Sequence, residues 1–250
     1  MFATLSTPLS TPRPHAAPAI PMSTPVASSP NSHAFVFCWE DVVAPMTLLA
    51  RRLGLQSTRH AMETAHAALA QDSYLQQALA TLEDQAIMLL TTAASIGPVV
   101  VVTEKSPTFM ELCCSVFFPR LGAFLLQADQ ANAQLTQHRI RVVALPRKFR
   151  FAMEYAAWRV NIFHSVCIDE LHRNVDGAFS LICVSSSHSD SLACVSAAHQ
   201  ACSVAHAIPK CIQTADPTQL SLEAFFAQLQ TLQRYVGTVA SHPGAFITLL

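Results

Sequence analysis

Five short apolar runs, each followed by a segment of helical pattern, constrain the fold of this chain more than any other feature. The runs cover residues 34–38, 98–103, 139–145, 179–184 and 207–212. They are rich in β-branched residues and apolar on both alternating faces, which is typical of parallel strands covered by helices on both sides. We therefore predict an α/β fold, a three-layer Rossmann-like parallel sheet of about five strands with right-handed crossovers.

The helical segments complete this prediction. Residues 58–94 carry apolar residues at helical spacing, in two helices or in one helix broken near Asp72. They belong to a small helical insert, residues 44–97, after the first strand. Further helices are expected at residues 107–118, 151–172, 189–204 and 220–240. A single domain over residues 34–250 accounts for them, because a chain of 250 residues suits one large core.

Residues 1–33 differ from the rest, since they are rich in Ser, Thr, Pro and Ala and contain no acidic residue. This composition predicts a disordered tail, or alternatively a transit peptide for a mitochondrion or plastid. We expect a cytoplasmic protein in the first case and an organellar one in the second.

Composition narrows the function classes. No run of about 18 apolar residues occurs, so no transmembrane segment is expected although 51% of the residues are hydrophobic. The net charge is −1 and no run of Lys and Arg exceeds two residues, so we expect neither a nucleic-acid partner nor an acidic-membrane footprint. The eight cysteines form no CxxC pair and indicate reduced core residues, and the eleven histidines show no zinc spacing.

In an open α/β sheet, ligands bind outside the carboxyl ends of the strands. The predicted strands therefore place chemistry at residues 38–42, 103–106, 145–148 and 184–188. Residues 36–45, Val-Phe-Cys-Trp-Glu-Asp-Val-Val-Ala-Pro, begin at the first of these ends.

This segment resembles the first signature of the haloacid dehalogenase-like hydrolases, in a short-cap subfamily whose version runs Phe-Asp-Trp-Asp-Asp-Thr-Leu-Leu-Pro. The resemblance places Cys38 at the aspartate nucleophile. Glu40 matches the second aspartate, the general acid/base, and Val42 matches the threonine. The position of the nucleophile is therefore occupied by a thiol.

Later segments are similar to the other signatures of that subfamily and follow in the same order. They are residues 101–121, 158–163, 182–187 and, for the closing helix and tail, 220–250. The resemblance implies that Thr103 is the phosphate-binding hydroxyl and that Arg159 stands at the third-signature lysine. Ser185 or Ser186 stands where the metal-binding aspartate belongs. Lys105 is a plausible phosphate neighbour.

The chemistry of that family is compromised here. Its Mg²⁺ requires hard oxygen ligands, whereas Cys38 offers a soft sulfur and Ser185 and Ser186 offer neutral hydroxyls. Asp41 tends to point elsewhere, and Asp190 lies further along the chain. We therefore expect no metal or other cofactor and treat Cys38, Glu40, Ser185 and Ser186 as vestigial positions.

The thiol of Cys38 is a poor candidate nucleophile. Two acids, Glu40 and Asp41, follow it and would raise its pKa, and no arginine occurs between Cys38 and Arg51. A free cysteine at the end of an apolar strand is most often a packed core residue.

Three hypotheses follow. The first is a pseudoenzyme, a binding or structural module that has protein partners in a larger assembly. The second is an atypical Mg²⁺-dependent phosphatase that uses Glu40 with Cys38 or a water nucleophile. The third is a metal-free phosphate or anion binder built from Thr103, Lys105 and Arg159, although Arg159 could equally form a salt bridge with Glu40. The sequence indicates no substrate.

Overall fold

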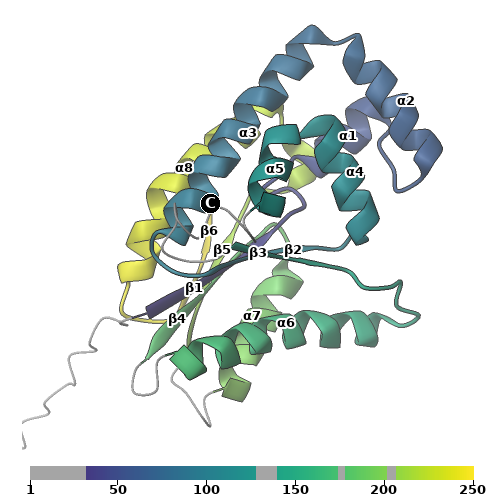
Figure 1. The fold of residues 1–250 in the computed structure, drawn as a ribbon. Coiled ribbons are helices and arrows are strands. Elements are labelled where there is room, and N and C mark those ends of the chain that lie inside the picture. The colour runs from purple at the N-terminus through teal and green to yellow at the C-terminus, as the bar shows by residue number, and fades with distance from the viewer. Residues whose placement is uncertain (1–31, 128–139, 174–177, 202–206) are drawn as a thin grey trace, which may run out of the picture.

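A six-stranded, all-parallel sheet forms the centre of the molecule, as the computed structural model of residues 32–127, 140–173, 178–201 and 207–250 shows (Figure 1). The strand order is β3-β2-β1-β4-β5-β6. The strands are β1 Ser32–Cys38, β2 Val99–Thr103, β3 Ile140–Ala144, β4 Phe179–Ser185, β5 Ala207–Gln213 and β6 Phe246–Leu249. The predicted fold class is confirmed, and the five predicted strands are β1 to β5.

The sixth strand, β6, was not predicted. It pairs in parallel with β5 at the edge of the sheet. It is only four residues long, and Ile247 and Leu249 are 56% and 73% exposed, so it lacks the continuous burial by which the other strands were found. The expectation of a tail after the last helix was therefore wrong at this point.

Eight helices and one short 3₁₀ turn lie in the described ranges. They are α1 Met46–Leu53, α2 Arg59–Ala70, α3 Ser73–Ala94, α4 Pro107–Phe117, α5 Pro119–Gln127, α6 Ala152–Arg173, α7 His188–Ala201, α8 Leu222–Ser241 and the turn η2 Pro217–Gln219. Asp72 breaks the long helical segment because its carboxylate accepts the backbone N–H of Leu75 and so begins α3. Ser106 and Ser221 cap α4 and α8 in the same way.

The helices form a layer on each face of the sheet (Figure 1). Successive side chains of β1 point alternately to the two faces of the sheet, so each helical layer packs against apolar residues. Phe35 and Phe37 belong to the core under α3, α4, α5 and α8, whereas Ala34 and Val36 pack toward α6 and α7. Both faces of the sheet are therefore buried under helices, which explains why the strand sequences are almost continuously apolar.

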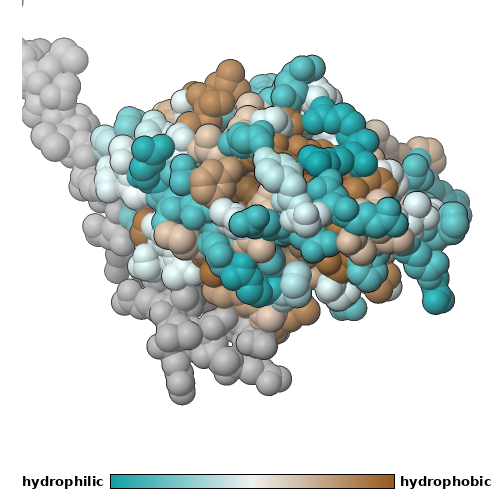
Figure 2. Space-filling model, turned by 90° about the horizontal axis from the view of Figure 1, so that it is seen from above, coloured by the Kyte–Doolittle hydropathy of each residue, from teal (hydrophilic) through white to brown (hydrophobic). Residues whose placement is uncertain are grey.

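Part of the predicted insert, residues 44–97, belongs to the helical layer that covers the sheet. Helix α3 lies beside α8 in the covering layer and buries one face, including Leu75, Leu79 and Leu89. The start of α3 and helix α2 lie farthest from the sheet, at the top of Figure 1. Seen from above, hydrophobic and hydrophilic residues alternate over the surface without one continuous apolar area (Figure 2).

Three further expectations concern the chain as a whole. Ser32 and His33 belong to β1, so the segment predicted as a tail ends earlier than expected, and residues 1–31 lie outside the described residues. The last residues of the helix predicted at 189–204 also lie outside them. Within the described ranges, no helix has the length and apolar character needed to cross a membrane.

Candidate functional site

The carboxyl ends of β1 and β4 meet at the centre of the sheet. From β1 the chain order runs outward to β2 on one side, while β4 lies on the other, so this is the switch point at which open α/β sheets bind ligands. Cys38 ends β1 and Ser185 ends β4. Both were named as site positions, and the structure brings them together.

Both side chains contact one carboxylate. The thiol of Cys38 donates to Oδ2 of Asp190 over 2.9 Å, and the hydroxyl of Ser185 donates to the same oxygen over 2.5 Å. Asp190 lies in the first turn of α7 and is 1% exposed. Burial, and next the charge of Asp190, raise the pKa of Cys38 well above its ordinary value. Cys38 is therefore a protonated, buried hydrogen-bond donor.

Arg159 neutralises this buried carboxylate. It comes from the middle of α6 and is 4% exposed, and its Nε lies 3.1 Å from Oδ1 of Asp190. Its Nη2 lies 3.0 Å from Oε1 of Glu104. Burial opposes the charge of the guanidinium, but the surrounding groups, Asp190 and Glu104 among them, outweigh it and raise the pKa of Arg159. The expected salt bridge with Glu40 is thus replaced by these two ion pairs.

Tyr155 completes the arrangement one helical turn before Arg159. Its hydroxyl donates to Glu104 and accepts from Nε of Arg159, which lies 3.0 Å away. The guanidinium also lies 5.5 Å from the ring centroid of Trp158. We call the side chains joined in this way the Arg159 cluster: Cys38, Glu104, Tyr155, Arg159, Ser185 and Asp190.

Glu40 and Thr103 form a neighbouring pair. Oγ1 of Thr103 donates to Oε1 of Glu40 over 2.5 Å, and the backbone N–H of Glu104 donates to the same oxygen over 3.2 Å. Thr103 is fully buried at the end of β2. Burial raises the pKa of Glu40. The hydroxyl that the resemblance assigns to phosphate is therefore bonded to the carboxylate that it assigns to proton transfer.

Asp41 has a local role. Its backbone is in the left-handed region, with φ at 59°, and its carboxylate accepts the backbone N–H and the hydroxyl of Thr47 over 2.8 and 2.6 Å. These bonds satisfy the start of α1. Asp41 is thus turned away from the Arg159 cluster and serves the turn between β1 and α1.

The remaining predicted positions contribute less. The backbone N–H of Lys105 donates to Oγ1 of Thr103, and among the described residues no hydrogen bond or ion pair involves its ammonium group. Ser186 is half-buried beside Ser185. Val42 is fully buried and packs in the core. Residues 145–148 add no side chain to the cluster.

The residues present do not fit a magnesium ion. Such an ion needs several free oxygen ligands, most of them carboxylates or waters. Here the thiol of Cys38 is a hydrogen-bond donor, Asp190 is paired with Arg159, and Glu40 is hydrogen-bonded to Thr103. Across the described ranges, no three His, Cys, Asp or Glu side chains are grouped as a metal ion would require.

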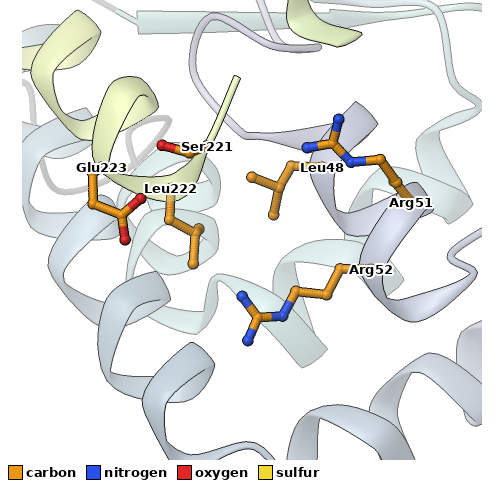
Figure 3. A pocket seen from close by; sticks show the side chains of 6 residues that line it. All are labelled: Leu48, Arg51, Arg52, Ser221, Leu222 and Glu223. Atoms are coloured by element: carbon orange, nitrogen blue, oxygen red, sulfur yellow. The ribbon is translucent and has the colours of Figure 1, made fainter. Parts of the chain in front are cut away.

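A pocket of about 320 Å³ lies elsewhere, between α1 and the start of α8 (Figure 3). It is lined by Leu48, Arg51, Arg52, Ser221, Leu222 and Glu223. Arg51 donates to the backbone carbonyls of Thr218 and Leu220, and Arg52 pairs with Asp72. Its arginines thus already hold parts of the chain together, and no residue predicted for the site reaches it.

Glu104 and Tyr155 were missed by sequence reasoning, and Asp190 was considered only as a replacement metal ligand. A weak signal existed for each acid. Glu104 directly follows a predicted strand, and Asp190 stands five residues after the end of β4, in the first helical turn, where an acid is favoured. Nothing in the local pattern indicated that Tyr155 would bond to Glu104.

Comparisons of this chain with protein-family models, with curated proteins and with solved structures found no match.

Proposed function

We propose that this chain is a pseudoenzyme, a fold resembling the haloacid dehalogenase-like hydrolases that is retained as a binding or structural module. The observation that carries the proposal is the state of Cys38. Its thiol is 3% exposed and donates to Asp190, which Arg159 holds in an ion pair. The position of a nucleophile is thus occupied by a protonated thiol that donates a hydrogen bond within a closed cluster.

An atypical phosphatase needs features that this geometry does not supply. A thiolate nucleophile would have to form where burial and Asp190 both disfavour it. A water nucleophile would need a free carboxylate, and Glu40 is engaged by Thr103 and by the backbone of Glu104. Both routes would first require the existing hydrogen bonds to break.

Anion binding is supported by one observation only. Nη1 of Arg159 is buried without a hydrogen-bond partner among the described residues. The surrounding charges oppose this role, because Arg159 is already paired with two carboxylates, those of Asp190 and Glu104. Glu40, which accepts the backbone N–H of Glu104, adds a third carboxylate next to the cluster. A phosphate would therefore meet excess negative charge.

Hydrolysis of para-nitrophenyl phosphate with millimolar Mg²⁺ tests the proposal. We expect no turnover above the buffer rate and no shift of Tm on adding Mg²⁺ or inorganic phosphate, because a ligand of the native state would raise stability. The proposal is overturned by turnover that Glu40→Gln abolishes and the control Glu111→Gln, on the exposed face of α4, preserves.

A further inference from the structure

The loop between β3 and α6 presents basic and apolar side chains together. In Figure 1 it is the extended stretch at the right that turns back into α6. Arg147, Lys148 and Arg150 are exposed, and Phe151 and Met153 are 65% and 81% exposed. We call these five residues the basic-apolar patch.

Phe149 holds the patch in place. Its half-buried ring lies 6.5 Å from the ring of Tyr155 and 6.1 Å from that of Trp158, measured between centroids. The guanidinium of Arg147 lies 5.9 Å from the Phe149 ring centroid. Oε2 of Glu154 accepts the backbone N–H of Arg150 over 3.2 Å. Phe149 is therefore fixed against the first turns of α6, while its neighbours in sequence remain exposed.

The three cations of the patch are not neutralised within the described part of the chain. None of them forms an ion pair with a described acid, and residues 146–153 contain no acidic residue. The whole chain has a net charge of only −1. The positive charge is thus local, and it lies next to exposed apolar side chains.

We propose that the basic-apolar patch docks on the surface of an anionic lipid bilayer. Clustered Lys and Arg side chains are attracted to anionic headgroups, and adjacent apolar side chains insert at the boundary of the acyl chains. Phe151 and Met153 are placed for that insertion because they project from the same short segment as the cations. The proposal departs from the expectation drawn from the length of basic runs, since Phe149 interrupts the run in sequence but not on the surface.

A single-stranded nucleic acid fits the patch less well. Such ligands stack successive bases on exposed aromatic rings along a basic groove. The ring of Phe149 is already packed against Tyr155 and Trp158, and Met153 has no ring to offer. Phe151 alone would remain for stacking.

Flotation of the full chain with lipid vesicles tests this inference. We expect binding to vesicles of phosphatidylcholine with phosphatidylserine, little binding to phosphatidylcholine alone, and weaker binding as salt rises. Each cation contributes about fivefold, so Arg147→Gln with Lys148→Gln and Arg150→Gln should weaken binding on the order of a hundredfold. Phe151→Ser with Met153→Ser should weaken it on the order of tenfold.

The control carries Arg59→Gln and Arg234→Gln, exposed arginines on α2 and α8, and should bind like the parent chain. Equal binding to neutral vesicles, or full binding by the triple variant, overturns the inference. Binding to a single-stranded oligonucleotide without vesicle binding also overturns it and assigns the patch to nucleic acid. Vesicle binding is read separately from phosphatase activity, so this inference and the pseudoenzyme proposal can fail independently.

Discussion

The molecule buries two cations in opposite ways. Arg159 is 4% exposed and is paired with two carboxylates, those of Asp190 and Glu104. Lys210, in the middle of β5, is fully buried, and its Nζ donates to the carbonyls of Val239 and Ala240 over 2.9 and 2.8 Å. Among the described residues, no acid pairs with Lys210.

The difference shows what each cation contributes. The two carboxylates stabilise the charged form of Arg159. Removing the Arg159 side chain would leave Asp190 buried without a counterion. Lys210 meets only the partial negative charge at the carboxyl end of α8, and burial lowers its pKa to about 8. Arg159 is therefore one part of an interdependent cluster, whereas Lys210 can lose its charge without leaving a buried acid unpaired.

The largest effect should separate these two cations directly. Arg159→Met should lower the free energy of unfolding by about 3–5 kcal/mol, because a buried carboxylate is left unpaired. Lys210→Met should change it by less than about 1 kcal/mol at pH 7, since lost hydrogen bonds are offset by the removal of a buried charge. Urea unfolding of both variants measures the difference. Equal losses would show that the cluster is no more interdependent than the lysine site.

The next effect concerns the position of the nucleophile. Cys38→Asp places a second carboxylate beside Asp190 and should cost about 2–4 kcal/mol at pH 7, with the loss shrinking toward pH 5 as one carboxyl is protonated. Cys38→Ser keeps a donor for Asp190 and should cost about 1 kcal/mol or less. Unfolding curves at both pH values provide the test. A Cys38→Asp protein as stable as Cys38→Ser would mean that the cluster opens readily.

Lys210 should give stability a distinctive pH dependence. Its pKa is lowered from 10.5 in the unfolded chain to about 8 in the folded one, so the folded state binds fewer protons between these values. Stability should therefore rise with pH across that window, by on the order of 2 kcal/mol relative to Lys210→Met. Subtracting the variant's free energy of unfolding cancels the titrations that both proteins share. The comparison requires that the substitution does not change the protonation of His33 in this window, because burial and the charge of Lys210 lower the pKa of His33. A flat difference between pH 8 and 10.5 would contradict the assignment.

The smallest effect tests how far the Arg159 cluster extends toward its rim. Tyr155→Phe removes a half-buried phenol that bonds to Glu104 and Arg159, and it should cost about 1 kcal/mol. Tyr74→Phe is the matched control, because its phenol bonds to Glu223 on an exposed surface. Thermal unfolding should detect the first change and not the second. Similar Tm values for the two variants would exclude Tyr155 from the energetics of the cluster.

The sequence alone was sufficient to predict the strands β1 to β5 and the break before α3 at Asp72. These features are local, because apolar periodicity and capping residues act within a few turns or strand residues. Even so, β6 escaped this reasoning, since it is only four residues long and none of its residues is buried.

Which charged groups contact one another depends on tertiary packing. Cys38 and Asp190 are 152 residues apart in the sequence. They are in contact because β1 and β4 are neighbouring strands and α7 begins three residues after the end of β4. Arg159 was correctly placed on a helix, yet its partners depend on how α6 crosses the sheet. Lys210 lies within a predicted apolar strand, and its two carbonyl partners come from the end of α8. Local patterns identify the apolar residues that form the core, whereas the burial and pairing of polar groups depend on packing between distant segments.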